Sequence, residues 1–133
     1  MKLICIGDSL TFGYGVHLSQ RWTRLCAQET GWGLVNEGIN GDTTGGMLAR
    51  MQGGVLAELR EGGLGADRPY VLLMGGSNDV FYSGFDAAAR ENMGAMIHQL
   101  FSVGVLVSRF RRMHRMRRGR GRPRSILKRQ SRQ

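Results

Sequence analysis

The feature that most constrains this chain is an unbroken apolar run near its start, Leu3-Ile4-Cys5-Ile6, which ends at Gly7 and leads directly into Asp8 and Ser9. A short run without alternating polar positions predicts a strand buried on both faces, as in a parallel sheet. Such a strand, ending in a tight turn, can hold a serine hydroxyl at the sheet edge beside free backbone N–H groups. The same residues also suit an ordinary strand-to-loop turn, because Gly, Asp and Ser are common in turns.

Strand and helix patterns alternate along the chain. Apolar runs predict strands at 2–7, 33–38 and 69–75, and residues 104–107 are expected to begin a fourth strand. Helical spacing predicts helices at 19–30, 44–60 and 86–101, and Gly-rich loops are expected at 8–18 and 61–69. This alternation predicts an α/β fold with a parallel sheet, the first strand in its centre and helices on both faces.

Details of the three helices can also be read from the sequence. Ser19 is a plausible N-cap for the first helix. Gly53-Gly54 weakens the middle of the second. The apolar stripe of the third is expected to consist of Met93, Met96, Ile97 and Leu100.

Polar, Gly-bearing turns follow each of the first three strands. In open α/β sheets, sites lie beyond the carboxyl ends of the strands, so these turns are expected to gather at one edge. Ester hydrolysis passes through a tetrahedral oxyanion, which must be met by hydrogen-bond donors that are already fixed around one point. Ser9 can supply an attacking oxygen and an N–H, Gly41 a second N–H that substrate can approach closely, and Asn78 a side-chain amide.

Three blocks in these turns resemble the SGNH, or GDSL-type, hydrolase family. They are Gly7-Asp8-Ser9-Leu10, Gly38-Ile39-Asn40-Gly41-Asp42-Thr43 and Gly76-Ser77-Asn78-Asp79. Their order, their spacing and the strand before each block all fit, and the resemblance covers residues 1–104, the N-terminal part of such a protein.

The resemblance implies a flavodoxin-like three-layer sandwich, C-terminally incomplete here, and a serine hydrolase acting on small esters or thioesters as an esterase, lipase or thioesterase. It implies Ser9 as nucleophile and Ser9, Gly41 and Asn78 as the oxyanion hole. Supporting positions are Gly7, Asp8, Asp42, Gly76 and Asp79. No cofactor or metal is expected, since no dinucleotide, Walker A or zinc spacing occurs.

The resemblance fails at the general base. The family carries an Asp-x-x-His near its C-terminus, but no Asp in this sequence has His three residues later. Three histidines remain, and each is a poor substitute: His17 lies in the loop after the nucleophile, His98 on a helix, and His114 among arginines. The general base is therefore unknown, and activity is expected to be impaired.

Charge divides the chain into two unequal parts. Residues 1–104 hold seven Lys or Arg and all ten Asp or Glu, whereas residues 105–133 hold twelve Lys or Arg and no acid. We therefore expect a truncated hydrolase domain at 1–107 and a disordered basic tail at 108–133. The tail could contact nucleic acid non-specifically through phosphates, or it could follow a shifted reading frame. The abrupt change inside a predicted core strand favours the shift.

Compartment and partners follow from what the sequence lacks. No apolar run approaches the roughly 18–20 residues of a membrane span, and no signal-peptide pattern precedes the first strand. Cys5 and Cys26 lie in apolar surroundings without redox or metal spacing and are expected to be reduced packing residues. A cytoplasmic protein with a small-molecule substrate is expected, and the sequence leaves its oligomeric state open.

Overall fold

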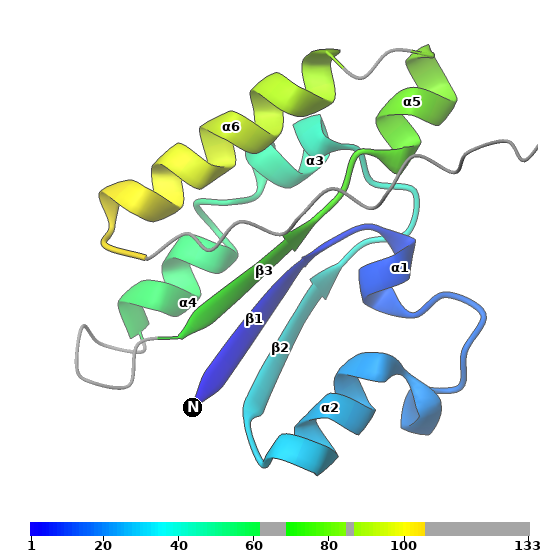
Figure 1. Ribbon diagram of the computed structural model, residues 1–133, viewed down its shortest axis with the longest axis vertical. Helices are drawn as coiled ribbons and strands as arrows, with labels where there is room; N and C mark the ends of the chain where they lie inside the picture. The colour runs from blue at the N-terminus through cyan, green and yellow to red at the C-terminus, as the bar shows by residue number, and fades with distance from the viewer. Residues whose placement is uncertain (62–68, 85–86, 106–133) are drawn as a thin grey trace, which may run out of the picture.

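Three parallel strands form one sheet in the order β2-β1-β3. They are β1 (Lys2–Gly7), β2 (Gly33–Gly38) and β3 (Tyr70–Met74). The computed structural model describes residues 1–61, 69–84 and 87–105 (Figure 1). The predicted parallel sheet with the first strand in its centre is therefore confirmed.

The strands end at the same level. Gly7, the last residue of β1, is paired with Gly38 of β2 on one side and with Met74 of β3 on the other. The turns that follow the three strands consequently leave the sheet at the same edge, as expected for parallel strands in register.

Helices cover both faces of the sheet and give it three layers (Figure 1). On one face lie α1 (Ser9–Phe12), a 3-10 helix (Leu18–Gln20) and α2 (Trp22–Thr30). On the other lie α3 (Thr44–Ala49), α4 (Val55–Glu61) and α6 (Ala87–Ser102), while α5 (Ser77–Ser83) stands at the carboxyl edge after β3. This is the α/β three-layer architecture that the alternating pattern predicts.

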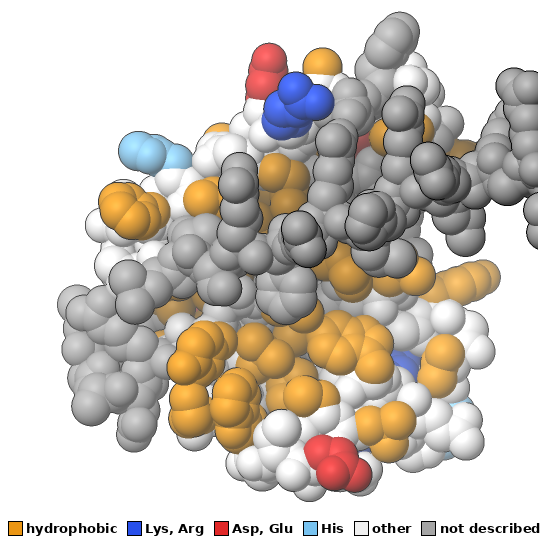
Figure 2. Space-filling model, in the orientation of Figure 1, with side chains coloured by type: hydrophobic (Ala, Val, Ile, Leu, Met, Phe, Trp, Pro, Cys, Tyr) orange, Lys and Arg blue, Asp and Glu red, His pale blue; other side chains and the backbone are white. Residues whose placement is uncertain are grey.

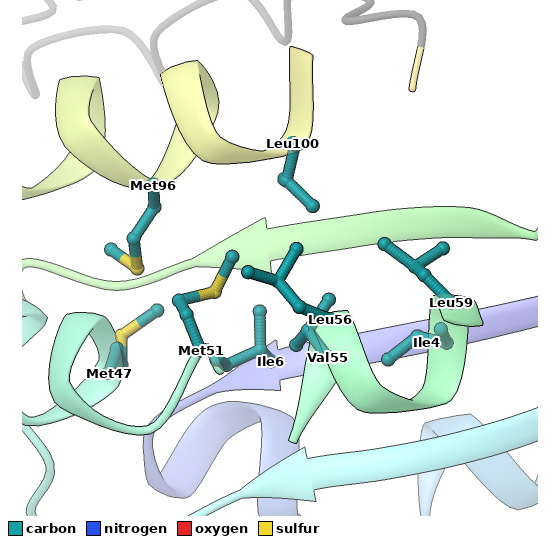
Figure 3. Close-up of a cluster of buried hydrophobic side chains, with 9 residues drawn as sticks. All are labelled: Ile4, Ile6, Met47, Met51, Val55, Leu56, Leu59, Met96 and Leu100. Atoms are coloured by element: carbon teal, nitrogen blue, oxygen red, sulfur yellow. The ribbon is translucent and has the colours of Figure 1, made fainter. Parts of the chain in front are cut away.

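The hydrophobic core lies between β1 and the layer formed by α3, α4 and α6 (Figure 3). Alternate β1 side chains point into it, because successive residues of a strand face opposite sides of the sheet. Its buried members are Ile4, Ile6, Met47, Met51, Val55, Leu56, Leu59, Met96 and Leu100. Three of these nine residues are methionines, whose unbranched thioether side chains fit irregular gaps in a core.

The opposite face of the sheet is covered less completely. There α2 packs against β2, and apolar side chains gather at the surface over the strands (Figure 2). Trp32 and Tyr70 stack in this region with ring centroids 5.6 Å apart, and Tyr70 remains 53% exposed.

Two predicted helices differ from the structure. The helix expected at 44–60 is divided into α3 and α4 by a turn at 50–54, where the Gly54 N–H donates to the Arg50 carbonyl. The Gly53-Gly54 pair explains the break, since each glycine costs about 1 kcal/mol in a helix interior. The helix expected at 19–30 begins at Trp22, with Arg21 and not Ser19 in the N-cap position.

Local structure was also missed next to the site. The predicted loop at 8–18 contains α1, because Asp8 caps its first turn, and the turn after β3 continues into α5. On α6, Met96 and Leu100 are buried and Met93 packs against the core, but Ile97 is 38% exposed and does not belong to the buried stripe.

The predicted fourth strand lies largely outside the described residues. Val105 packs against the core and its N–H donates to the Leu100 carbonyl, which closes α6, but it is not in a strand. Residues 106–107, the basic segment 108–133 and His114 lie beyond the described ranges, so the expectations for the tail stay predictions. Within the described ranges no helix is both long and apolar enough to span a bilayer.

Close approach of α1 to β2 requires a glycine at position 38. A Cβ there would overlap the backbone N of Phe12 and come within 2.7 Å of its Cα. We predict that Gly38→Ala lowers the free energy of unfolding by about 1–3 kcal/mol, the usual cost of overpacking. Gly33→Ala is the matched control, because a Cβ at this position in the same strand meets nothing within 4 Å. Equal urea midpoints for the two variants would contradict the packing of α1 on β2.

The two cysteines are both free and differ in burial. Burial in β1 raises the pKa of Cys5 from 9.0 to about 11, with a smaller contribution from Cys26, which is half-buried. Because the thiolate is the reactive form, this higher pKa lowers the reactivity of Cys5 at pH 8.5. We predict that iodoacetamide modifies Cys26 well before Cys5 in the folded chain, as followed by peptide mass spectrometry. In urea, where both cysteines are exposed, the two modification rates should become equal. Equal modification rates of Cys5 and Cys26 in the folded chain would contradict the burial of Cys5.

Candidate active site

Ser9 begins α1 directly beyond the carboxyl end of β1. The side chain of Asp8, only 2% exposed, caps the helix by accepting a hydrogen bond from the Leu10 N–H at 2.9 Å. As the first helical residue, Ser9 has an N–H without an intrahelical acceptor. Gly7 must be a glycine, since a Cβ there would overlap Thr11 Oγ1 and approach the Met74 carbonyl to 2.6 Å. Asp8 and Gly7 thus shape the turn that presents Ser9.

The second turn places Gly41 after β2 in the left-handed region, with φ 75°. A hydrogen bond from the Asp42 N–H to the Ile39 carbonyl, at 3.2 Å, closes this turn. It is tied to the first turn, since the Ile39 N–H donates to the Gly7 carbonyl at 3.1 Å. Gly41 is exposed, and its N–H has no acceptor among the residues that the structure describes.

The third turn brings Asn78 to the second one. Gly76, at φ 113°, allows the chain to turn from β3 into α5, whose second residue is Asn78. Its Nδ2 donates to the Asp42 carbonyl at 2.8 Å. An amide nitrogen carries two hydrogens, so this bond fixes the side chain and leaves one N–H to donate.

Asp79 fastens α5 to the beginning of α3. It is 7% exposed, and its two carboxylate oxygens accept hydrogen bonds from the Thr44 N–H at 2.9 Å and the Thr44 hydroxyl at 2.6 Å. Asn92 of α6 donates to the same hydroxyl at 3.1 Å. Asp79, predicted above as a supporting residue, therefore joins the third family block to α3, the helix that follows the second block.

One further side chain at this edge was missed by sequence reasoning. The Arg50 guanidinium donates to Asp42 Oδ2 at 2.8 Å and to the Gly7 carbonyl at 2.9 Å, and it lies 3.8 Å from a Glu37 oxygen. Nothing in the local sequence singles out this arginine, because its partners are 8 and 43 residues away.

No histidine of the described ranges is hydrogen-bonded to Ser9. His17 Nδ1 is 2.8 Å from the Ser19 hydroxyl and caps the 3-10 helix. His98 is exposed near the end of α6, which runs back from the carboxyl edge of the sheet (Figure 1). Nor does any group of three or more His, Cys, Asp or Glu in this part of the chain have the geometry of a metal site.

Four exposed apolar side chains lie close along the chain to the proposed site residues of the three turns. Leu10 follows Ser9, Ile39 precedes Gly41, and Phe81 and Tyr82 follow Asn78, with exposures between 49% and 82%. The two aromatic rings meet edge to face with centroids 5.5 Å apart. The Tyr82 hydroxyl is 3.7 Å from the position that a Cβ on Gly41 would occupy. The polar groups at the sheet edge thus have an apolar rim.

Comparison with known proteins identifies the family to which this chain belongs. Residues 5–130 match the model of the GDSL-like Lipase/Acylhydrolase family. The chain therefore belongs to this family, and the resemblance read from the three blocks is confirmed.

Individual relatives agree with this assignment. Esterase TesA of Pseudomonas aeruginosa is 29% identical over 111 residues, which are 79% of this chain and 51% of TesA. The crystal structure of TesA is matched with a TM-score of 0.66 at 27% identity, over 79% of this chain and 57% of that one. A G-D-S-L family protein from Desulfitobacterium hafniense gives a TM-score of 0.67 at 25% identity, over 78% of this chain and 55% of that one. The chain thus spans about half the length of these relatives.

The Asp79–Thr44 contact should contribute measurably to stability. In Asp79→Asn an amide replaces one carboxylate oxygen, so at least one buried Thr44 donor loses its acceptor, at a cost of about 1–3 kcal/mol. We predict a lower urea midpoint for this variant. Glu91→Gln, an exposed acid-to-amide change on α6, is the control and should leave the midpoint unchanged. Two equal midpoints would show that Asp79 does not fasten α5 to α3.

Proposed function

We propose that this chain carries the nucleophile and the oxyanion hole of a serine ester hydrolase. Ser9 supplies the attacking oxygen, and the Ser9 N–H, the Gly41 N–H and the Asn78 amide meet the oxyanion. The observation that carries this proposal is the set of hydrogen bonds that joins the three strand-end turns: Ile39 to Gly7, and Asn78 to the Asp42 carbonyl. These bonds hold each turn in place and leave one donor of each turn unused by the described residues.

In the proposed reaction, Ser9 Oγ forms a bond to the acyl carbon while the carbonyl electron pair moves onto oxygen. The three donors stabilise this oxyanion, and preorganised donors of this kind are typically worth 10²–10³ in rate each. The alcohol or thiol then leaves with a proton, and water hydrolyses the acyl-serine to the acid. A general base must take the serine proton in the first step and return it to the leaving group.

Among the residues that the structure describes, no hydrogen bond joins Ser9 to a possible base. A serine without a neighbouring base is a protonated alcohol and a weak nucleophile. The sequence contains no Asp-x-x-His, and the histidines of the described ranges lie elsewhere. We therefore expect an active site with a formed oxyanion hole and impaired turnover. Full activity would need a segment that brings an aspartate and a histidine to Ser9.

The substrate class we propose is a small ester or thioester. Its support is the apolar rim of Leu10, Ile39, Phe81 and Tyr82, which suits the apolar part of an acyl or aryl group beside the polar donors. The name of the relative TesA, an esterase, points the same way.

Hydrolysis of p-nitrophenyl acetate tests this function. We predict slow turnover, below the 1–10³ per second typical of enzymes. An oxyanion hole without its full triad retains a rate acceleration of only about 10³–10⁴ over the reaction in water. Ser9→Ala should lower this rate, because attack through the serine is lost while the Gly41 and Asn78 donors remain. Ser102→Ala, on an exposed position of α6, should not change it.

Two results would contradict the proposal, one concerning the nucleophile and the other concerning the missing base. A rate that Ser9→Ala leaves unchanged would remove Ser9 as nucleophile. Ser9-dependent turnover within the normal enzymatic range would show that a base is present after all, and His17→Ala, His98→Ala and His114→Ala would then identify it.

A further inference from the structure

We propose that Arg50 is a positioning residue that sets the Gly41 amide against Ser9. This inference rests on the function proposed above and assigns a role to a side chain outside the family blocks. Arg50 ends α3, and its guanidinium reaches back between β1 and the turn after β2.

The contacts of this guanidinium reach two of the three turns directly. Nη2 donates to the carbonyl of Gly7, two residues before Ser9, at 2.9 Å. Nε donates to Oδ2 of Asp42, the residue after Gly41, at 2.8 Å. The third turn is reached through Asp42, whose carbonyl accepts the Asn78 amide at 2.8 Å. Arg50 therefore bonds close to two of the proposed donors and reaches the third, Asn78, through Asp42.

An arginine suits this place for a geometric reason. Its planar guanidinium carries five N–H groups in fixed directions, so two bonds from it fix the distance and the angle between their acceptors. A lysine has one ammonium on a flexible stem and imposes no such angle. The Arg50 side chain is 21% exposed and that of Asp42 is 13% exposed, so these bonds are largely shielded from water and less weakened by it than a surface pair.

Two other features of the turn agree with this role. Gly46 leaves room for the Asp42 carboxylate, since a Cβ on Gly46 would overlap Asp42 Oδ1. The Glu37 carboxylate, 3.8 Å from Nη1, adds a second negative charge beside the guanidinium. Asp42 is thereby held by its carboxylate on one side and by its carbonyl on the other, and Gly41 lies directly before it in the chain.

The test uses Arg50→Lys, which keeps the positive charge and loses the fork, with Arg60→Lys on the exposed face of α4 as the matched control. The first measurement is the Ser9-dependent hydrolysis of p-nitrophenyl acetate, corrected for the folded fraction. Because a misplacement of about 1 Å can cost about 100-fold, we expect kcat to fall at least tenfold. We expect KM to change less than threefold, and Arg60→Lys to behave as the unmodified chain.

The second measurement does not depend on activity. In ¹H–¹⁵N spectra, Arg50→Lys should shift the Gly41 amide and the Asn78 side-chain signals, while the amides of Gly31 and Gly94 stay in place. Asp42→Asn should shift the same signals. In the double variant, the kcat loss should be no larger than in Arg50→Lys alone, since residues that act through one contact are not additive.

The outcomes separate this inference from the proposed function. If kcat and KM of the folded fraction are unchanged and only the unfolding midpoint falls, Arg50 is merely structural and the inference is wrong. If Ser9→Ala has no effect on the rate, the proposed function fails, and the spectra alone decide whether Arg50 positions Gly41. Unmoved Gly41 and Asn78 signals would overturn the inference in either case.

Discussion

The pairing of β1 with a parallel strand on each side is the constraint on which the rest of the structure depends. Because Gly7 is paired with both Gly38 and Met74, the three strands stop at one level and their turns leave the sheet together. The chain moves from β1 to β2 on one side and then crosses to β3 on the other, so β1 is where the strand order reverses. Such a reversal opens a crevice at the carboxyl edge, and Ser9 stands directly beyond β1.

The turns are then joined by polar contacts of very different range. Short-range bonds shape each turn, as when Asp8 caps α1. Long-range bonds join the turns: Asp79 holds Thr44 across 35 residues, Asn78 holds the Asp42 carbonyl across 36, and Arg50 holds the Gly7 carbonyl across 43. The proposed oxyanion hole would depend on these bonds, because donors must be fixed before substrate arrives and the cost of ordering them is then met in folding.

Glycines make the close approaches at this edge possible. At Gly7 a side chain would collide with Thr11 and approach the backbone of β3, and at Gly38 it would collide with the backbone of α1. These two residues belong to the first and second family blocks, so part of each block serves the packing of the turns. The blocks therefore encode the way in which a strand joins a helix, as well as the donors proposed above.

By itself, the sequence determined the strands, their parallel order around β1, the edge at which the three strand-end turns gather and the family, because buried strands and strand-end turns leave strong local patterns. It also showed that no Asp-x-x-His is present. Only the tertiary structure decided that Asn78 bonds the Asp42 carbonyl, that Ile97 is partly exposed, and that Arg50 bridges Gly7 and Asp42. These features depend on side-chain directions and on contacts between residues far apart in the chain, which no local periodicity encodes.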